Sequence, residues 1–324
     1  MELVDQMLAG EQQPLSRLIT LVDRDTPDAL QIMKEIYPHT GRGYCIGITG
    51  PPGGGKSTLV DRLTALARSK GLTVGIIAVD PSSPFTGGAV LGDRIRMQHH
   101  FLDSGVFIRS MATRGSRGGL PRTAKKVIKL FDAFGKDLIM VETVGVGQTE
   151  LDIMDAVDSV VVVLVPEAGD AIQTMKAGLI EIADIFVVNK TDRAGAEQLI
   201  IELQSSLLLS PRRCEWETPV LATQAVNDIG IQEVYEQLER RRQVLEKSGR
   251  LASRREEQRR REMLQTFEDR VRDELIGLMR SNPHLVELEE KVRKAEIDPY
   301  SAASQILSDG IVIRELLSQL EHEG

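Results

Sequence analysis

The sequence predicts an α/β fold, with a mostly parallel sheet flanked by helices, because strand-like and helix-like segments alternate over residues 44–240. The strand-like runs are rich in Val and Ile and carry few charges, which is typical of strands covered on both faces. Helical patterns separate most of the runs, as parallel neighbours require. The runs lie at 44–49, 73–79, 106–110, 138–142, 159–165, 185–189 and 220–223.

Helical segments are expected on both sides of this domain. Residues 1–43 predict a helical extension, in which Leu15, Leu18, Ile19 and Val22 share one helical face. Residues 241–324 show no strand pattern and predict a helical arm. We expect the arm to bury its apolar stripes against a second copy of the chain, or else against its own domain. The stripes are Val271, Leu275, Leu278 and Met279, and Ile311, Ile313, Leu316, Leu317 and Leu320.

The segment 233–258 is dense in charge and includes three consecutive arginines at 240–242. Glu and Gln residues are interspersed among the arginines. This pattern favours one long solvated helix over a patch that binds an anionic ligand.

The composition is typical of a soluble globular protein, with 41% hydrophobic and 27% charged residues among 324. A net charge of −8 argues against non-specific nucleic-acid binding by the whole chain. The two cysteines have no metal-type spacing, which fits a reducing, cytoplasmic location. The N-terminus lacks a signal pattern and no apolar run reaches roughly 18 residues, so we expect no membrane segment.

A phosphate-binding loop is predicted between the first strand-like run and the helical pattern that follows it. Gly50, Gly55, Lys56 and Ser57 match G-x-x-x-x-G-K-[ST], a pattern that also arises by chance in glycine-rich turns. The strand–loop–helix context favours a P-loop NTPase fold, with Lys56 reaching the β- and γ-phosphates and Ser57 binding Mg²⁺. The predicted loop comprises Gly50, Pro51, Pro52, Gly53, Gly54, Gly55, Lys56, Ser57 and Thr58.

Polar residues at the ends of later strands predict the rest of a metal and γ-phosphate site. Asp80 and Glu142 each end an apolar run, and both are candidates to approach Mg²⁺. Asp93 follows in a glycine-containing stretch, and it could join that site or cap the start of a helix. Asp80 also has an alternative role, which is to shape a turn. Gly145 could offer its N–H to the γ-phosphate, and Gln148 could position the attacking water.

The sequence Asn189-Lys190-Thr191-Asp192 predicts selection of guanine. The Asp192 carboxylate can accept hydrogen bonds from the N1–H and amino group of guanine, a pair of donors that adenine lacks. Asn189 would tie loops together and the Lys190 stem would cover the base. An ordinary polar turn is the alternative. After the last strand, a backbone N–H is expected to reach the base oxygen from Thr223, Gln224 or Ala225.

The chain resembles the MeaB/ArgK family of P-loop GTPases over nearly its whole length. The resemblance is carried by GPPGGGKST, VDPSSPFTGGAVLGDRIRM, RSMATRG, ETVGVGQTE, VPEAGD and NKTD. That family consists of GTPase chaperones of adenosylcobalamin-dependent acyl-CoA mutases. The resemblance implies binding of GTP or GDP with Mg²⁺, a homodimer formed through the C-terminal helices, and slow hydrolysis that a mutase stimulates. It also implies that hydrolysis gates the loading, protection or repair of the mutase cofactor.

The resemblance further implies roles for particular residues. Asp80, Asp93 and Glu142 match positions that surround the metal and the first two switch regions of the family. The segment 165–176 matches a third switch that senses the partner. Lys176 matches a lysine that contributes to stimulated hydrolysis.

Two other functions share this core. One is a metallochaperone GTPase that inserts nickel or cobalt, which the few Cys and His residues disfavour. The other is a kinase for a transport protein, for which the sequence reveals no acceptor pocket.

Overall fold

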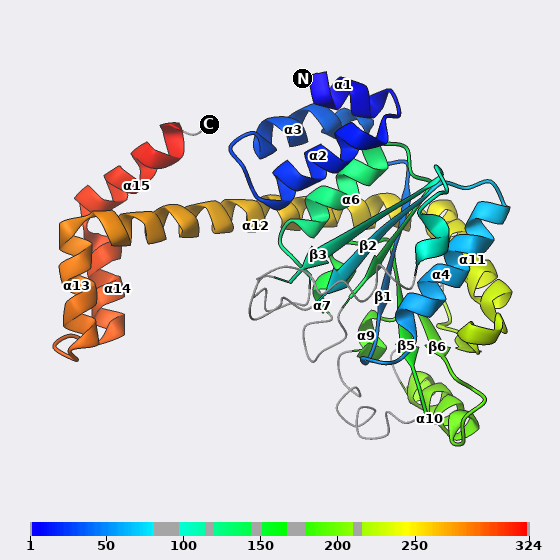
Figure 1. Cartoon of the computed structure of the whole chain (residues 1–324). Helices are drawn as coiled ribbons and strands as arrows, with labels where there is room; N and C mark the ends of the chain where they lie inside the picture. Colours follow the sequence, from blue (N-terminus) through cyan, green and yellow to red (C-terminus); the bar gives the residue numbers. More distant parts are fainter. Residues whose placement is uncertain are drawn as a thin grey trace. The chain divides into compact units, whose positions relative to one another are not determined.

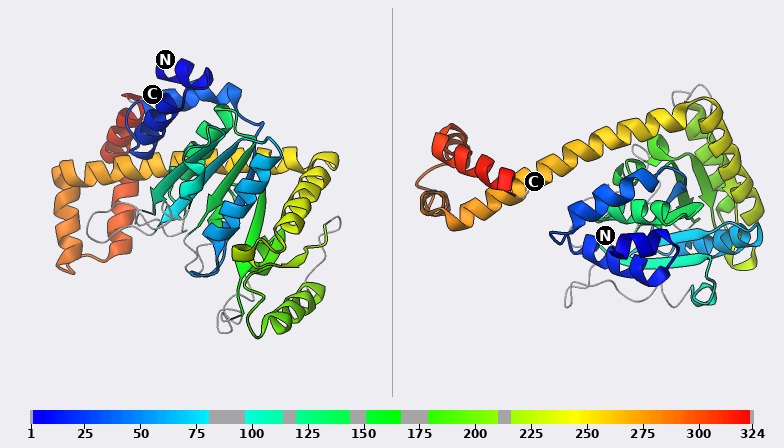
Figure 2. Two further views of the ribbon diagram at one scale, coloured as in Figure 1. Left: turned by 45° about the vertical axis from the view of Figure 1, so that its right-hand side comes forward. Right: turned by 90° about the horizontal axis from the view of Figure 1, so that it is seen from above.

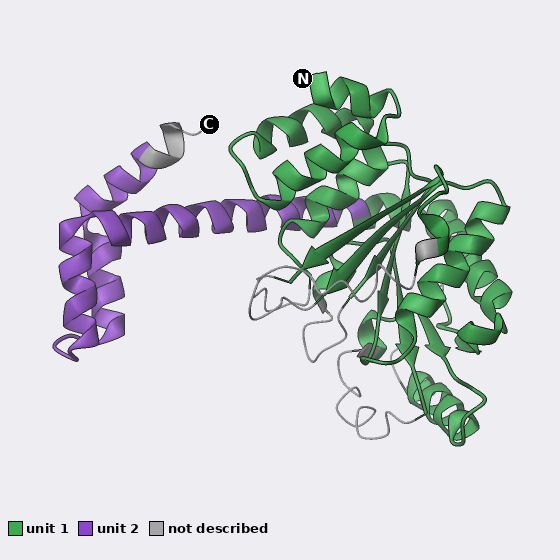
Figure 3. Cartoon of the chain, in the orientation of Figure 1, with its two compact units in different colours: residues 1–254 green, residues 255–324 purple. Residues whose placement is uncertain are grey.

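The computed structural model describes residues 2–80, 97–113, 120–143, 151–166, 179–209 and 216–322. The chain divides into two compact units, Met1–Arg254 and Arg255–Gly324 (Figure 3). The domain boundaries expected after residues 43 and 240 stay predictions. Among the described residues, no helix is both long enough and apolar enough to cross a membrane.

Unit 1 is built on a sheet whose strands all run parallel in the described part of the chain (Figure 1). The strand order is β3-β2-β4-β1-β5-β6-β7. The α/β prediction is therefore confirmed, and the central strands are buried along their whole length, as their Val and Ile content indicates. The strands are β1 (Tyr44–Thr49), β2 (Val74–Asp80), β3 (Val106–Ala112), β4 (Leu138–Glu142), β5 (Ser159–Leu164), β6 (Ile185–Val188) and β7 (Val220–Ala222).

Helices cover both faces of the sheet (Figures 1 and 2). On one face, apolar residues of α4 (Lys56–Ser69) and α11 (Ile231–Lys247) share a core with β1 and β2. On the other face, α2 (Gln12–Asp23), α3 (Ala29–Ile36) and α6 (Ala124–Ala133) share a second core with the sheet. The four residues predicted to share a helical face are all buried in this second core: Leu15, Leu18, Ile19 and Val22.

Shorter helices and α10 complete the described part of unit 1, and α12 begins there. They are α1 (Glu2–Leu8), η1 (Tyr37–His39), η2 (Gln98–His100), α7 (Leu151–Met154), α9 (Leu179–Ile182), α10 (Ala196–Leu209), η4 (Ala225–Asn227) and α12 (Arg250–Ser281).

The charged segment 233–258 is not one solvated helix, so that expectation was wrong. Helix α11 ends at Lys247, and α12 begins at Arg250. Between them Gly249 adopts a φ of +71°, a left-handed conformation that costs little without a Cβ. Arg241 is buried rather than solvated, because it pairs with a carboxylate at the start of β6.

That carboxylate, Asp184, is fully buried and joins several elements of unit 1. Its Oδ1 accepts a hydrogen bond from Arg241 Nη2 at 2.9 Å, and Arg254 Nη1 lies 3.6 Å from its Oδ2. Trp216 Nε1 donates to the Asp184 carbonyl at 2.8 Å, while the Arg241 guanidinium lies 5.1 Å from the centre of the Trp216 ring. A buried carboxylate needs such partners, since an unpaired one is strongly destabilising. The cluster fixes α11 and the first turn of α12 at the end of the sheet where β6 begins.

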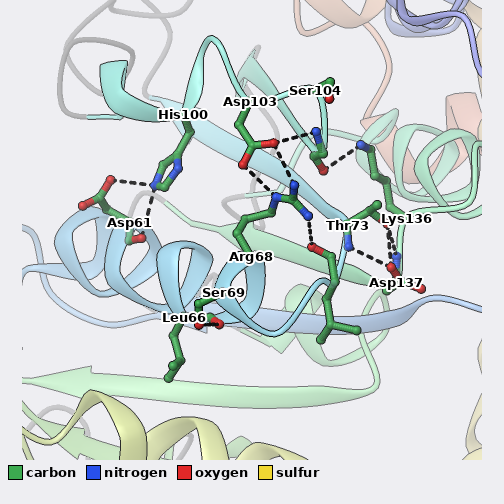
Figure 4. A network of polar contacts seen from close by, with 12 residues as sticks. Asp61, Leu66, Arg68, Ser69, Thr73, His100, Asp103, Ser104, Lys136 and Asp137 are labelled. Carbon is green, nitrogen blue, oxygen red and sulfur yellow. Dashed lines mark hydrogen bonds and ion pairs between the residues drawn. The ribbon is translucent and has the colours of Figure 1, made fainter.

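A second polar network lies at the C-terminal end of α4 (Figure 4). Arg68 makes a bidentate contact with Asp103, at 2.8 and 2.9 Å, and donates to the Leu72 carbonyl. Near the middle of α4, Asp61 lies 3.1 Å from His100. These contacts attach η2 and the turn before β3 to the helix that follows the phosphate loop.

Unit 2 contains the rest of α12 and three further helices, α13 (Pro283–Arg293), α14 (Pro299–Ser308) and α15 (Gly310–His322). Asn282 caps α13 by accepting from two backbone N–H groups, and Asp298 caps α14 in the same way. The buried apolar core described for this unit is small: Leu278, Leu285, Val312 and Leu316.

Candidate nucleotide-binding site

The predicted phosphate loop connects β1 directly to α4, as a phosphate-binding loop requires. Gly50 has a φ of +136°, and a Cβ there would lie 2.0 Å from the Val163 carbonyl oxygen. Gly55 has a φ of +86°, and its Cβ would lie 2.2 Å from Asn189 Nδ2. The backbone of the neighbouring strand β5 at Gly50, and the Asn189 side chain at Gly55, come so close to these positions of positive φ that the loop favours glycine at both.

The two polar residues that follow Gly55 start α4 and are both buried. Lys56 Nζ donates to the carbonyls of Gly50 and Pro51, at 2.8 and 3.1 Å. The ammonium group is therefore held over the loop, where it can neutralise phosphate charge. Ser57 Oγ donates to Glu142 Oε1 at 2.7 Å.

The Ser57–Glu142 contact brings together two of the predicted metal ligands. Glu142 is the last residue of β4, and its side chain lies on the α4 side of the sheet. Asp80 is the last residue of the adjacent strand β2, and its side chain is also buried. A hydroxyl and carboxylates are hard oxygen ligands that suit Mg²⁺, which takes few protein ligands and completes its shell with water and phosphate. Ser57 and Glu142 would hold this ion, with Asp80 nearby on the neighbouring strand.

Asn189 joins the phosphate loop to the loop after β7. Its Nδ2 donates to the Gly54 carbonyl at 2.9 Å. Its Oδ1 accepts from the Ala225 N–H at 3.0 Å and from Thr223 Oγ1 at 3.1 Å. The predicted role of Asn189 in tying loops together matches these contacts.

The side-chain role of Thr223 was not predicted, because only a backbone contact was expected from this segment. The strand register would have indicated this contact. Val188 pairs with Ala222 at the ends of β6 and β7, and Asn189 and Thr223 are the next residues after these strand ends. Two polar residues one step beyond paired strand ends are placed to hydrogen-bond.

The backbone of the loop after β7 is already engaged within the protein. The N–H groups of Thr223, Gln224 and Ala225 donate to the Val188 carbonyl, the Ile229 carbonyl and Asn189 Oδ1, respectively. The N–H group expected to reach the base oxygen therefore makes another contact in this structure, and a contact between this segment and guanine stays a prediction.

Asp192 is exposed and lies in the turn after β6. Lys190 in the same turn has a φ of +59°, which is uncommon for a residue with a side chain. The Thr191 N–H and hydroxyl both donate to the Thr223 carbonyl, at 3.1 and 3.2 Å. These contacts hold the turn against the loop after β7 and leave the Asp192 carboxylate accessible to a base.

Four predicted residues lie outside the described part of the chain: Asp93, Gly145, Gln148 and Lys176. The described residues gather at the carboxyl ends of β1, β4, β6 and β7, where ligands of parallel α/β sheets bind. The arrangement offers a phosphate loop, a metal-ligand pair and an exposed carboxylate for a base, which are the parts of a nucleotide site.

Comparison with known protein families is in agreement with this geometry. Residues 15–280 match the sequence model of the methylmalonyl-CoA mutase-associated GTPase MeaB. The chain belongs to the MeaB family. MeaB-family membership also confirms the resemblance that the motifs predicted.

Individual relatives are similar over most of their length. A Pyrococcus abyssi protein named as a GTPase is 50% identical over 314 residues, covering 95% of this chain and 96% of that protein. The Escherichia coli GTPase ArgK is 36% identical, covering 79% of this chain and 80% of ArgK. The Caenorhabditis elegans methylmalonic aciduria type A homolog, a mitochondrial protein, is 32% identical, covering 94% of this chain and 82% of that protein.

Among solved structures, a crystal structure of a LAO/AO transport system kinase is similar to this MeaB-family chain. It aligns with a TM-score of 0.70 and 27% identity, covering 99% of this chain and 97% of the other. The comparison supports a P-loop fold with N- and C-terminal helical additions, and membership of the MeaB family supports guanine-nucleotide binding and GTP hydrolysis.

Proposed function

We propose that this chain is a GTPase chaperone that gates adenosylcobalamin loading, protection or repair of an acyl-CoA mutase. The observation that carries the proposal is membership of a family named for association with methylmalonyl-CoA mutase. Similarity to a methylmalonic aciduria type A homolog over 94% of the chain supports the same partner.

The geometry supports a separate role for each part of the site. The phosphate loop and Lys56 hold the phosphates, and Asp192 selects guanine. Bound Mg²⁺ would neutralise phosphate charge during hydrolysis. Ser57 donates to Glu142 here, so the serine hydroxyl and the carboxylate that would hold the ion are already adjacent. Asp80, Asp93, Gly145, Gln148 and Lys176 complete the proposed machinery.

The proposal predicts that hydrolysis by this chain is slow alone and rises severalfold with a partner mutase. Phosphate release from GTP would be measured for the full chain, with and without a purified adenosylcobalamin-dependent methylmalonyl-CoA mutase. The Lys56→Ala variant is the control and should release little phosphate in either mixture. An unchanged rate with every such mutase tested would contradict the partner assignment.

The same assay distinguishes a second candidate, a phosphotransferase, which the name of the similar solved structure suggests. With GTP labelled in its γ-phosphate, a hydrolase returns the label as inorganic phosphate. A kinase transfers the label to protein or to a small molecule.

Metal insertion receives no comparable support: in the described ranges, no group of three or more His, Cys, Asp or Glu side chains is arranged to hold a metal ion.

A further inference from the structure

Two threonine side chains are hydrogen-bonded to each other directly beneath the phosphate loop. Strands β1 and β4 are parallel neighbours, with Ile48 paired to Glu142. Thr49 and Thr143 are the next residues along each strand, and the Thr143 N–H continues the ladder to the Ile48 carbonyl at 3.0 Å. Thr143 Oγ1 donates to Thr49 Oγ1 at 2.8 Å.

This pair lies on the opposite face of the sheet from Glu142, because side chains alternate along a strand. Glu142 points toward α4, where Ser57 is. On the face of the threonines, apolar residues including Cys45, Val141 and Ile153 form one core. Thr49 is fully buried and Thr143 is 4% exposed.

Packing alone does not explain two hydroxyls in this position. Valine has nearly the same shape as threonine, and replacing both partners of a buried hydrogen bond by apolar groups of the same shape is often nearly neutral for stability. A hydrogen bond fixes relative position more sharply than contact between two methyl groups does, since it depends on distance and angle. The pair therefore adds a positional constraint between two strand ends.

Both strand ends lead directly into the nucleotide site. Thr49 precedes Gly50, whose carbonyl accepts from Lys56 Nζ at 2.8 Å. Thr143 follows Glu142, whose carboxylate accepts from Ser57 Oγ at 2.7 Å. The hydroxyl pair thus joins the backbone that holds the lysine to the backbone that carries the acidic metal ligand.

We propose that Thr143 is a positioning residue for GTP hydrolysis, an inference that rests on the proposed function. Its hydroxyl, bound to Thr49, holds the carboxyl end of β4 against the start of the phosphate loop. This keeps the Glu142 carboxylate within reach of the Ser57 hydroxyl, and so sets how well the site holds Mg²⁺ with the nucleotide.

The test compares full-length variants by single-turnover GTP hydrolysis at a series of Mg²⁺ concentrations. Thr143→Val should lower the rate roughly tenfold, the effect of losing one buried hydrogen bond. It should also raise the Mg²⁺ concentration for half-maximal rate, with a smaller change in GTP affinity. Thr143→Ser keeps the hydroxyl and should behave like the wild type.

Three further variants separate positioning from general loss of stability. Thr49→Val removes the same hydrogen bond from the other side, and the double variant should be no slower than either single one. Thr64→Val is the matched control, because Thr64 is a buried threonine of α4 whose hydroxyl bonds the Val60 carbonyl at 2.7 Å. Thr64→Val should leave the Mg²⁺ dependence unchanged.

Three results would overturn the positioning role: unchanged kinetics in Thr143→Val, additive losses in the double variant, or a loss in Thr143→Ser as large as in Thr143→Val. If one valine variant fails to fold, the other reports on the same hydrogen bond. A wild-type chain without Mg²⁺-dependent GTP turnover would instead contradict the proposed function.

Discussion

Lys136 is a buried lysine just before β4, at the end of the sheet where the strands begin. Its Nζ donates to the Gly105 carbonyl at 2.9 Å, beside the Arg68–Asp103 pair (Figure 4). Burial, reinforced by the charge of Arg68, lowers the pKa of the Lys136 ammonium to about 8. The folded chain therefore holds this positive charge at a cost.

This residue predicts a rise in stability at alkaline pH. Between pH 8 and 10.5 the unfolded chain keeps a proton on Lys136 that the folded chain loses, so the free energy of unfolding increases with pH in this window. Across this pH window, the free energy of unfolding of the wild type should rise by roughly 3 kcal/mol relative to that of Lys136→Met. Urea unfolding at several pH values measures the difference. The exposed Lys247→Met variant is the control, and parallel pH profiles for wild type and Lys136→Met would refute the prediction.

Candidate residues were predictable where chemistry follows from a local motif. Lys56, Ser57 and Asp192 belong to short patterns whose spacing predicts their roles, and those roles stay predictions. The side-chain contacts of Thr143 and Thr223 escaped prediction because each hydroxyl bonds a partner on, or just after, a neighbouring strand. That partner depends on strand order and register, which one sequence does not reveal.

Helix α12 carries apolar residues that the described part of unit 2 leaves exposed. Met263 is 63% and Phe267 is 66% exposed, and Leu264 lies beside them at 43%. The small core of unit 2 begins further along, with Leu278. The stripes predicted to contact a second copy instead contribute Leu278 and Leu316 to the core within unit 2. We propose that a second copy of the chain covers Met263, Leu264 and Phe267.

Sedimentation of the full chain should give twice the monomer mass of 35.8 kDa. Replacing Leu264 and Phe267 by Ser should shift the equilibrium toward monomer, because two apolar side chains would no longer be removed from water. Leu209→Ser is the matched control, since Leu209 is an 88% exposed leucine of α10 in unit 1. A wild-type mass equal to one chain, at micromolar concentration, would exclude this dimer.

The strands were easier to predict than the charged helices. Apolar runs such as 159–165 contain no charged residue and lie between turn-favouring residues, here Asp158 and Pro166, so each strand stands out from its surroundings. In 233–258 the charge pattern hid both the break at Gly249 and the burial of Arg241. Burial of that arginine depends on Asp184, which lies 57 residues earlier in the sequence.

For the whole molecule, the sequence predicts a parallel α/β fold but not the order of its strands. Strand β4 lies between β1 and β2, so Glu142 comes to rest beside Ser57 although 85 residues separate them. The same sheet places Asn189 against Gly54. The site is thus assembled by topology from parts that the motifs identify one by one.

Together these parts form the proposed site for a guanine nucleotide, in which Asp192 reads the base. Calorimetric titration of the full chain with GDP, ADP and xanthosine diphosphate, in the presence of Mg²⁺, tests this base selection. Wild type should bind GDP far more tightly than ADP, because adenine lacks the donors that the Asp192 carboxylate accepts. In Asp192→Asn, GDP affinity should fall roughly a hundredfold and xanthosine diphosphate affinity should rise, because the amide can donate to the added carbonyl. Undiminished preference for GDP in Asp192→Asn would show that Asp192 does not read the base.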